Sequence, residues 1–293
     1  MEARTSRRQA LLTASVVGAV AGALSGLFGV GGGIVIVPGL VLLAELAQRR
    51  AHATSLAAIV PIAVAGAAGY ALEDAVDWPS AALLVAGAAA GTFAGTHFLR
   101  RIPDKALRVI FALFMVGAAI ALPLEVTGAA QRSDLTVLAG AGLLGVGVVA
   151  GVLAGLLGVG GGIVMVPALV LLLALPQPIA KGTSLVVIIP TALVPTFRNV
   201  RAGDADLGLA ASAGMTGVLF GFAASLVSVR LDPVLSAVLF GALLVAMAVR
   251  LLLSARAAAR GQPRRTWTSL TAPGLIPTRW WPGAWTRCRR RPG

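Results

Sequence analysis

Long apolar runs separated by short polar segments dominate the chain. The runs nearly free of charged side chains are residues 11–47, 53–72, 81–99, 106–124, 135–175, 183–197, 207–229 and 233–248. Most reach the roughly 17–25 residues that an α-helix needs to cross a bilayer. Backbone amides in hydrocarbon must bond within their own segment, and the runs lack the polar–apolar alternation of barrel strands. The pattern predicts an all-α polytopic membrane protein.

Composition supports this prediction. Only 12% of the 293 residues are charged, against roughly 25% in a soluble domain. The net charge of +13 raises nucleic acid as a partner. The basic residues, however, stand at the ends of apolar runs and in the tails, as membrane topology requires. We therefore expect a lipid bilayer and no nucleic acid as partner. The single cysteine, Cys288, excludes a disulfide framework within the chain, and we predict no cofactor, metal site or catalytic residue.

The chain also repeats itself. Residues 26–38 read GLFGVGGGIVIVP, and 129 positions later residues 155–167 read GLLGVGGGIVMVP. The same offset relates residues 54–56 to 183–185 and Pro61 to Pro190. After a one-residue slip, an offset of 130 relates Gly87, Gly91 and Pro103 to Gly217, Gly221 and Pro233. We infer two homologous transmembrane halves, 11–125 and 137–253, joined by a linker at 126–136.

The ends of the chain lie outside these halves. We expect residues 1–10 to be a cytoplasmic N-terminus and 254–293 a basic, disordered cytoplasmic tail. The basic start and the apolar run after it imitate a secretory signal, but the repeat makes that run part of the fold. The C-terminal residues 261–293 are rich in Arg, Trp and Pro, and we assign them no transport role.

The charges bear on whether the second half is inverted. Each opening segment, 11–47 and 135–175, is too long for one span and contains a glycine run. If each forms a hairpin, only Arg132, Lys181 and Arg230 among the basic residues lie outside. Single crossings would instead expose eight basic residues: Arg49, Arg50, Arg100, Arg101, Lys105, Arg108, Lys181 and Arg230. The positive-inside rule favours hairpins. Each half then has five passes, or three plus a re-entrant pair, and the second half is upside down. Inverted repeats with glycine-broken helices are typical of secondary transporters.

The doubled glycine element, the Thr-Ser-Leu stretch after each copy and the Arg-Ile-Pro turn at 101–103 resemble the sulfite exporter (TauE/SafE) family, also called the toluene sulfonate uptake permeases. The resemblance covers roughly residues 11–253. It implies an inner-membrane permease, with both termini cytoplasmic, for sulfite, sulfonates, sulfoacetate or related organosulfur and carboxylate anions, coupled to the proton gradient. Composition and spacing indicate only a repeated, glycine-broken bundle.

The glycine runs are the first candidate anion site. Glycines interrupt a helix and expose backbone N–H groups, and the next half-helix turns its positive dipole end into the break. Such an end suits an oxyanion. Close helix packing through small residues is the alternative explanation. The residues are Gly29, Gly31, Gly32, Gly33, Gly158, Gly160, Gly161 and Gly162.

Hydroxyl and basic side chains complete the candidate set. Thr54, Ser55, Thr183 and Ser184 either donate to the ligand or cap helices. Arg198 and Asn199 close the run from Thr183 and either recruit anions or anchor the helix. His52 and Lys181 stand at equivalent positions before the Thr-Ser pairs, and we interpret them as interfacial polar residues. No midplane proton carrier is evident.

The sequence thus favours a secondary anion transporter working by alternating access. A non-transporting membrane scaffold or assembly factor is the alternative. An intramembrane enzyme is weaker, because the glycine runs lack the spacing of a dinucleotide or phosphate loop and no zinc-protease motif occurs.

Overall fold

The computed structural model describes residues 2–98, 112–122, 137–157 and 161–259, and within them every regular element is a helix. The first half contains α1 (Glu2–Phe28), α2 (Gly33–Leu42), α3 (Gln48–Leu72), α4 (Trp78–Phe98) and the helix Ala112–Leu122. The second contains α6 (Val137–Leu157), α7 (Gly162–Leu173), α8 (Gln177–Arg201), α9 (Leu207–Arg230) and α10 (Pro233–Ala259). The all-α prediction is confirmed for these residues.

Five of these helices are long and apolar enough to cross a bilayer: Arg7–Phe28 within α1, the whole of α3, α8 and α9, and Pro233–Arg250 within α10. Their outward faces carry large apolar side chains. Leu138 is 84% exposed and Met215 72% exposed, which in water would leave a large apolar surface unprotected. The predicted linker 126–136 lies outside the described residues, while α10 continues past residue 254, where we expected the tail to begin.

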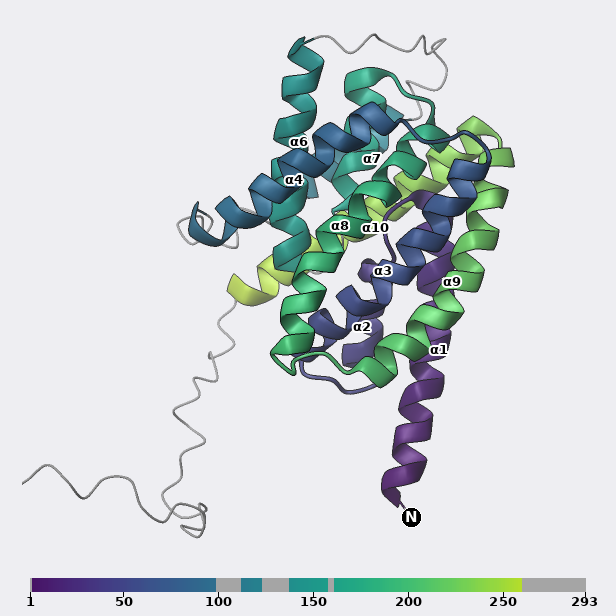
Figure 1. The fold of residues 1–293 in the computed structure, drawn as a ribbon, viewed down its shortest axis with the longest axis vertical. Coiled ribbons are helices and arrows are strands. Elements are labelled where there is room, and N and C mark those ends of the chain that lie inside the picture. The colour runs from purple at the N-terminus through teal and green to yellow at the C-terminus, as the bar shows by residue number, and fades with distance from the viewer. Residues whose placement is uncertain (1, 99–111, 123–136, 158–160, 260–293) are drawn as a thin grey trace, which may run out of the picture.

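Helices of the first half pack against helices of the second half. α1 packs along α9, and α4 packs along α6 (Figure 1). A Cβ on Gly18, Gly22 or Gly26 of α1 would lie 2.1–2.2 Å from the carbonyl oxygen of Ala213, Gly217 or Gly221 of α9. The contacts advance together along both helices, so α1 and α9 are parallel. Small residues allow this close approach of two backbones.

The α4–α6 contact repeats the α1–α9 contact. A Cβ on Gly151 would lie 2.2 Å from the carbonyl oxygen of Ala88, as one on Gly22 would from Gly217. Both pairs are related by 129 residues, and α3 and α8, like α4 and α9, also begin 129 residues apart. The one-residue slip that the sequence predicted before Gly87 is therefore absent, because equivalent positions of α4 and α9 remain 129 residues apart. Gly87 of α4 and Gly217 of α9, which suggested the slip, stand at neighbouring rather than equivalent positions.

The central helices α3 and α8 run in opposite directions, although they are counterparts in the repeat. Tyr70, near the end of α3, contacts Gly182, near the start of α8, and Gly66 contacts Leu185. The ends of α3 and α1 also meet, because the Tyr70 hydroxyl donates to the carbonyl oxygen of Gly26 at 2.6 Å. This arrangement places the midpoints of α3 and α8 at the same level.

Candidate functional site

Both glycine runs break a helix, as predicted. α1 ends at Phe28 and α2 begins at Gly33, and between them Gly29, Gly31 and Gly32 have φ of 71°, 82° and 71°. Gly161, with φ of 76°, precedes the start of α7. Side chains disfavour this left-handed region, which is why glycine stands at these turns. Gly158 and Gly160 lie outside the described residues.

The two breaks touch each other. A Cβ placed on Gly162 would lie only 2.6 Å from the carbonyl oxygen of Gly29 and 2.9 Å from Cα of Val30. A Cβ on Gly31 would lie 3.1 Å from Cδ1 of Ile188 and 3.5 Å from Cγ2 of Ile59. These isoleucines stand at the midpoints of the 25-residue helices α8 and α3. Two segments far apart in sequence therefore meet level with the middle of two membrane-length spans.

Each break ends in the N-terminus of a short half-helix. α2 turns back along α1, since Gly32 packs against Ala21 and Gly39 against the earlier Val17. At ten residues, α2 is about 15 Å long, half of a hydrocarbon core. It is therefore too short to cross a hydrocarbon core by itself. Gly161 packs against the carbonyl oxygen of Ala150 as Gly32 does against that of Ala21, so the second break repeats the geometry of the first.

The electrostatics of both N-termini favour an anion. No side chain caps Gly32 or Gly161, and neither first turn contains an acidic residue. The opening amides of a helix have no intrahelical acceptor, and the helix dipole adds partial positive charge there. Gly33 and Gly162 are both buried, which strengthens this charge by excluding water. The N-terminus of α7 touches the first break at the carbonyl oxygen of Gly29, three residues before the N-cap of α2.

The two predicted serines differ in their partners. The Ser184 hydroxyl donates to the carbonyl oxygen of Gly29 at 2.9 Å, so Ser184 holds the first break in place. Ser55, its counterpart in the repeat, is fully buried, and its hydroxyl has no hydrogen-bond partner among the described residues. Residue Gly158, the counterpart of Gly29, is not described. Ser55 is thus a buried polar group that a ligand would satisfy.

The two predicted threonines tie the halves together. Thr183 accepts a hydrogen bond from the backbone N–H of Asp77 at 2.8 Å, and Thr54 accepts one from that of Asp206 at 3.0 Å. Each bond runs from one half to the segment that opens α4 or α9 in the other half. These hydroxyls therefore act on backbone amides, close to the capping alternative, and stand one helix turn or more from Ile59 and Ile188.

Arg198 and Asn199, at the end of α8, lie away from the breaks. Arg198 is exposed in the last turn of α8, about 15 Å along the helix from Ile188. The backbone carbonyl of Asn199 accepts from the N–H of Asp204 and closes the α8–α9 turn. The structure does not bring these two residues to the place where the breaks meet.

Lys181 is the residue that the sequence interpretation placed wrongly. It is fully buried rather than interfacial, and its backbone packs against Gly29. The apolar run begins only at residue 183, but α8 begins at Gln177, so Lys181 lies one turn inside the helix. The offset relation to His52 and the closeness of Lys181 to the glycine element were the only sequence signals of its position.

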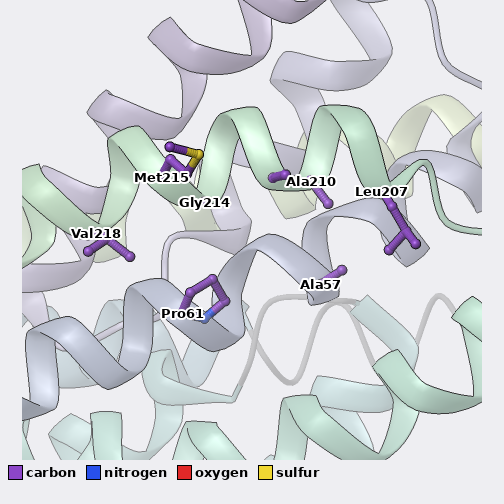
Figure 2. A pocket seen from close by; sticks show the side chains of 8 residues that line it. Ala57, Pro61, Leu207, Ala210, Gly214, Met215 and Val218 are labelled. Carbon is purple, nitrogen blue, oxygen red and sulfur yellow. The ribbon is translucent and has the colours of Figure 1, made fainter.

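A groove of about 380 Å³ lies elsewhere, between α3 and α9 (Figure 2). Its lining is Ala57, Pro61, Leu207, Ala210, Ala211, Gly214, Met215 and Val218. All of these side chains are apolar, and Met215 and Leu207 are largely exposed. The groove therefore suits acyl chains and offers nothing that would select an anion.

Comparisons with known proteins indicate the family of the chain. The sequence profile of the sulfite exporter TauE/SafE family matches residues 2–122 and 143–282. The probable membrane transporter protein YunE of Bacillus subtilis (strain 168) is 28% identical over 230 residues, which are 70% of this chain and 84% of that protein. The probable membrane transporter protein YdhB of the same organism is 33% identical over 105 residues, 36% of this chain and 42% of that protein. A probable membrane transporter protein of Haemophilus influenzae is 32% identical over 167 residues, 54% of this chain and 62% of that protein. No solved structure matches the chain.

Proposed function

Because the chain belongs to the sulfite exporter TauE/SafE family, and is thus a multi-pass membrane protein of a transporter family, we propose that it is a secondary transporter of small anions. Its substrates are sulfite, sulfonates, sulfoacetate or related organosulfur compounds. The observation that carries this proposal is the contact between the two glycine breaks, at Gly29 and Gly162, next to the uncapped N-termini of α2 and α7. Two positive helix ends near the centre of the bundle would bind an oxyanion without a fixed basic side chain.

The anion sits between the opening amides of α2 and α7. Gly29, Gly31, Gly32 and Gly33, and the second-half glycines, keep side chains away from this place. Ser55 and Ser184 border it from α3 and α8, and the hydroxyl of Ser55, which has no partner among the described residues, donates to the anion. Thr54 and Thr183 act from a distance by fixing the segments that open α9 and α4.

The two halves form inverted repeats around this site. The opposite directions of α3 and α8 support this, as do the matching exchanges of α1 with α9 and of α4 with α6. In such transporters, rocking of one part against the other opens the central site to each side of the membrane in turn. Alternating access at the midplane follows from this arrangement. We place the protein in the cell inner membrane, with both termini cytoplasmic and the proton gradient as the driving force.

The alternative, a membrane scaffold or assembly factor, requires no flux of solute. A scaffold explains the small-residue contacts between α1 and α9, but not the two uncapped, buried helix N-termini at the glycine breaks. Radiolabelled sulfite moves across a vesicle membrane only in the first case, so flux separates the two hypotheses.

The test is sulfite flux into proteoliposomes that contain the purified protein, compared with protein-free vesicles. The decisive variant is Gly162→Ala, since its methyl group would press on the Gly29 carbonyl oxygen. The matched control is Gly145→Ala, another helical glycine of the second half, whose Cβ would meet nothing within 4 Å. We expect flux with the wild type and with Gly145→Ala, and a loss of at least about tenfold with Gly162→Ala. Absence of flux for sulfite, sulfoacetate and small sulfonates in wild-type vesicles would refute the proposal.

A further inference from the structure

A lysine is buried beside the first glycine break. Lys181 stands in the second turn of α8, and none of its surface is exposed. Its Cα would lie 2.7 Å from a Cβ on Gly29, so the backbones of α8 and the break are in direct contact. Ser184, one turn further along α8, bonds to the same glycine. Lys181 is thus part of the wall around the break.

The ammonium group has only neutral partners. Nζ donates to the Ser236 hydroxyl at 2.5 Å and to the Ser228 hydroxyl at 3.3 Å. The ring of Phe28, the last residue of α1, lies beneath it with its centroid 5.8 Å from Nζ. Among the described residues, no carboxylate lies within ion-pair distance of Lys181.

An ion pair among the described residues on this end of the bundle does not involve Lys181. It joins Arg230 to Glu73 at 3.5 Å, with the arginine side chain 77% exposed. A charge removed from water costs several kcal/mol unless an opposite charge or a set of hydrogen bonds compensates it. Lys181 makes two such bonds, while its ammonium carries three protons. One N–H of this buried ammonium therefore has no acceptor, and its charge has no counterion, among the described residues.

Two serines near the end of α1 differ in their hydrogen-bond partners. Ser228 donates its own proton to the Leu27 carbonyl oxygen at 2.8 Å, so it is fixed between α1 and the ammonium. On α1, Ser25 lies one turn before Gly29, is fully buried and has no hydrogen-bond partner among the described residues. Ser25 is therefore a second buried donor near the break without an acceptor among the described residues.

We propose that Lys181 is an anion-binding residue, and that its ammonium, with the Ser236 hydroxyl, holds the negative group of the substrate at a subsite next to the central break. This inference rests on the proposed function, because it concerns the same path. Lys181 and Ile188 are seven residues apart, or about 10 Å along α8. The anion thus has one binding position at the buried lysine and the next at the paired helix ends.

The test compares sulfite affinity, measured by isothermal titration in detergent, with the KM of sulfite flux in vesicles. Lys181→Gln removes the charge but keeps a hydrogen-bonding side chain, and Lys181→Arg keeps the charge. Arg230→Gln is the matched control, because it removes an exposed cation from the same end of the bundle. We expect about a tenfold or greater rise in Kd and KM for Lys181→Gln, as for loss of a charge-assisted bond. Lys181→Arg should stay within a few-fold of wild type, and Arg230→Gln should equal it.

Each outcome decides the question. If Lys181→Gln is folded and binds sulfite as tightly as wild type, the lysine only links α8 to α9 and α10, and the inference is wrong. If Lys181→Gln does not fold, Ser236→Ala takes its place. A several-fold rise in Kd then supports the subsite, and an unchanged Kd refutes it. Wild-type protein that neither binds nor moves sulfite, sulfoacetate or a small sulfonate would instead sink the proposed function itself.

Discussion

Replacing Gly31 by alanine tests the role of the break most sharply, because the chain provides a control with the same backbone cost. Gly31 has φ of 82° and Gly203, in the α8–α9 turn, has φ of 71°. An L-residue in this region costs roughly 1–2 kcal/mol. A Cβ on Gly203 meets nothing within 4 Å, whereas one on Gly31 lies 3.1 Å from the flexible end of Ile188.

The stability loss should therefore be similar for the two variants, about 1–2 kcal/mol, with a few tenths more for Gly31→Ala if Ile188 must shift. Transport should not be similar. The methyl group on Gly31 would lie between the breaks and the midpoints of α3 and α8, where we place the anion, while the one on Gly203 faces solvent.

The assay is sulfite flux per folded molecule in vesicles, together with denaturant unfolding of each variant in detergent. We expect Gly203→Ala to transport like wild type and Gly31→Ala to lose at least about tenfold of the rate. Equal transport by the two variants would show that the break serves packing alone. A much larger stability loss for Gly31→Ala than for Gly203→Ala would refute the reasoning about the backbone.

Three further substitutions separate supporting residues from the site. Thr183→Val leaves the backbone N–H of Asp77 without its acceptor. The free energy of unfolding should therefore fall by about 1–3 kcal/mol, while the KM of vesicle flux stays unchanged. A raised KM would show that Thr183 contacts the anion. Ser184→Ala leaves the carbonyl oxygen of Gly29 without its donor. Denaturant unfolding should show a free energy of unfolding lower by about 1–2 kcal/mol, and flux should be slower. Wild-type flux would show that the break keeps its conformation without Ser184. Arg49→Gln removes an exposed ion pair whose arginine is 82% exposed, so flux and the unfolding midpoint should both match wild type; a marked change in either would contradict the weak coupling expected of surface pairs.

The sequence was sufficient for features that depend on local or repeated patterns. Apolar runs predicted the helices, and the doubled glycine element predicted both breaks, because few residues other than glycine take positive φ. The 129-residue offset predicted two homologous halves, and the equivalent contacts of Gly32 on Ala21 and of Gly161 on Ala150 agree with it. These predictions needed no knowledge of how the halves meet.

Contacts between the two halves could not be predicted from the sequence. The pairing of α1 with α9, and the meeting of Gly29 with Gly162, depend on how two bundles interlock. Thr54 and Thr183 were assigned to the ligand or to caps, and only the packing shows that each bonds to the other half. Lys181 was misplaced for the same reason: α8 starts before the apolar run does, and the serines around its ammonium come from α9 and α10.

The most direct measurement is an anomalous difference map from crystals soaked in selenite, the selenium analogue of sulfite. The proposal predicts a selenium peak between the first-turn amides of α2 and α7, at hydrogen-bonding distance from the backbone N–H groups near Gly33 and Gly162. Peaks confined to other surfaces, at selenite concentrations that compete fully with sulfite in flux, would contradict the claim that the paired helix ends bind the anion.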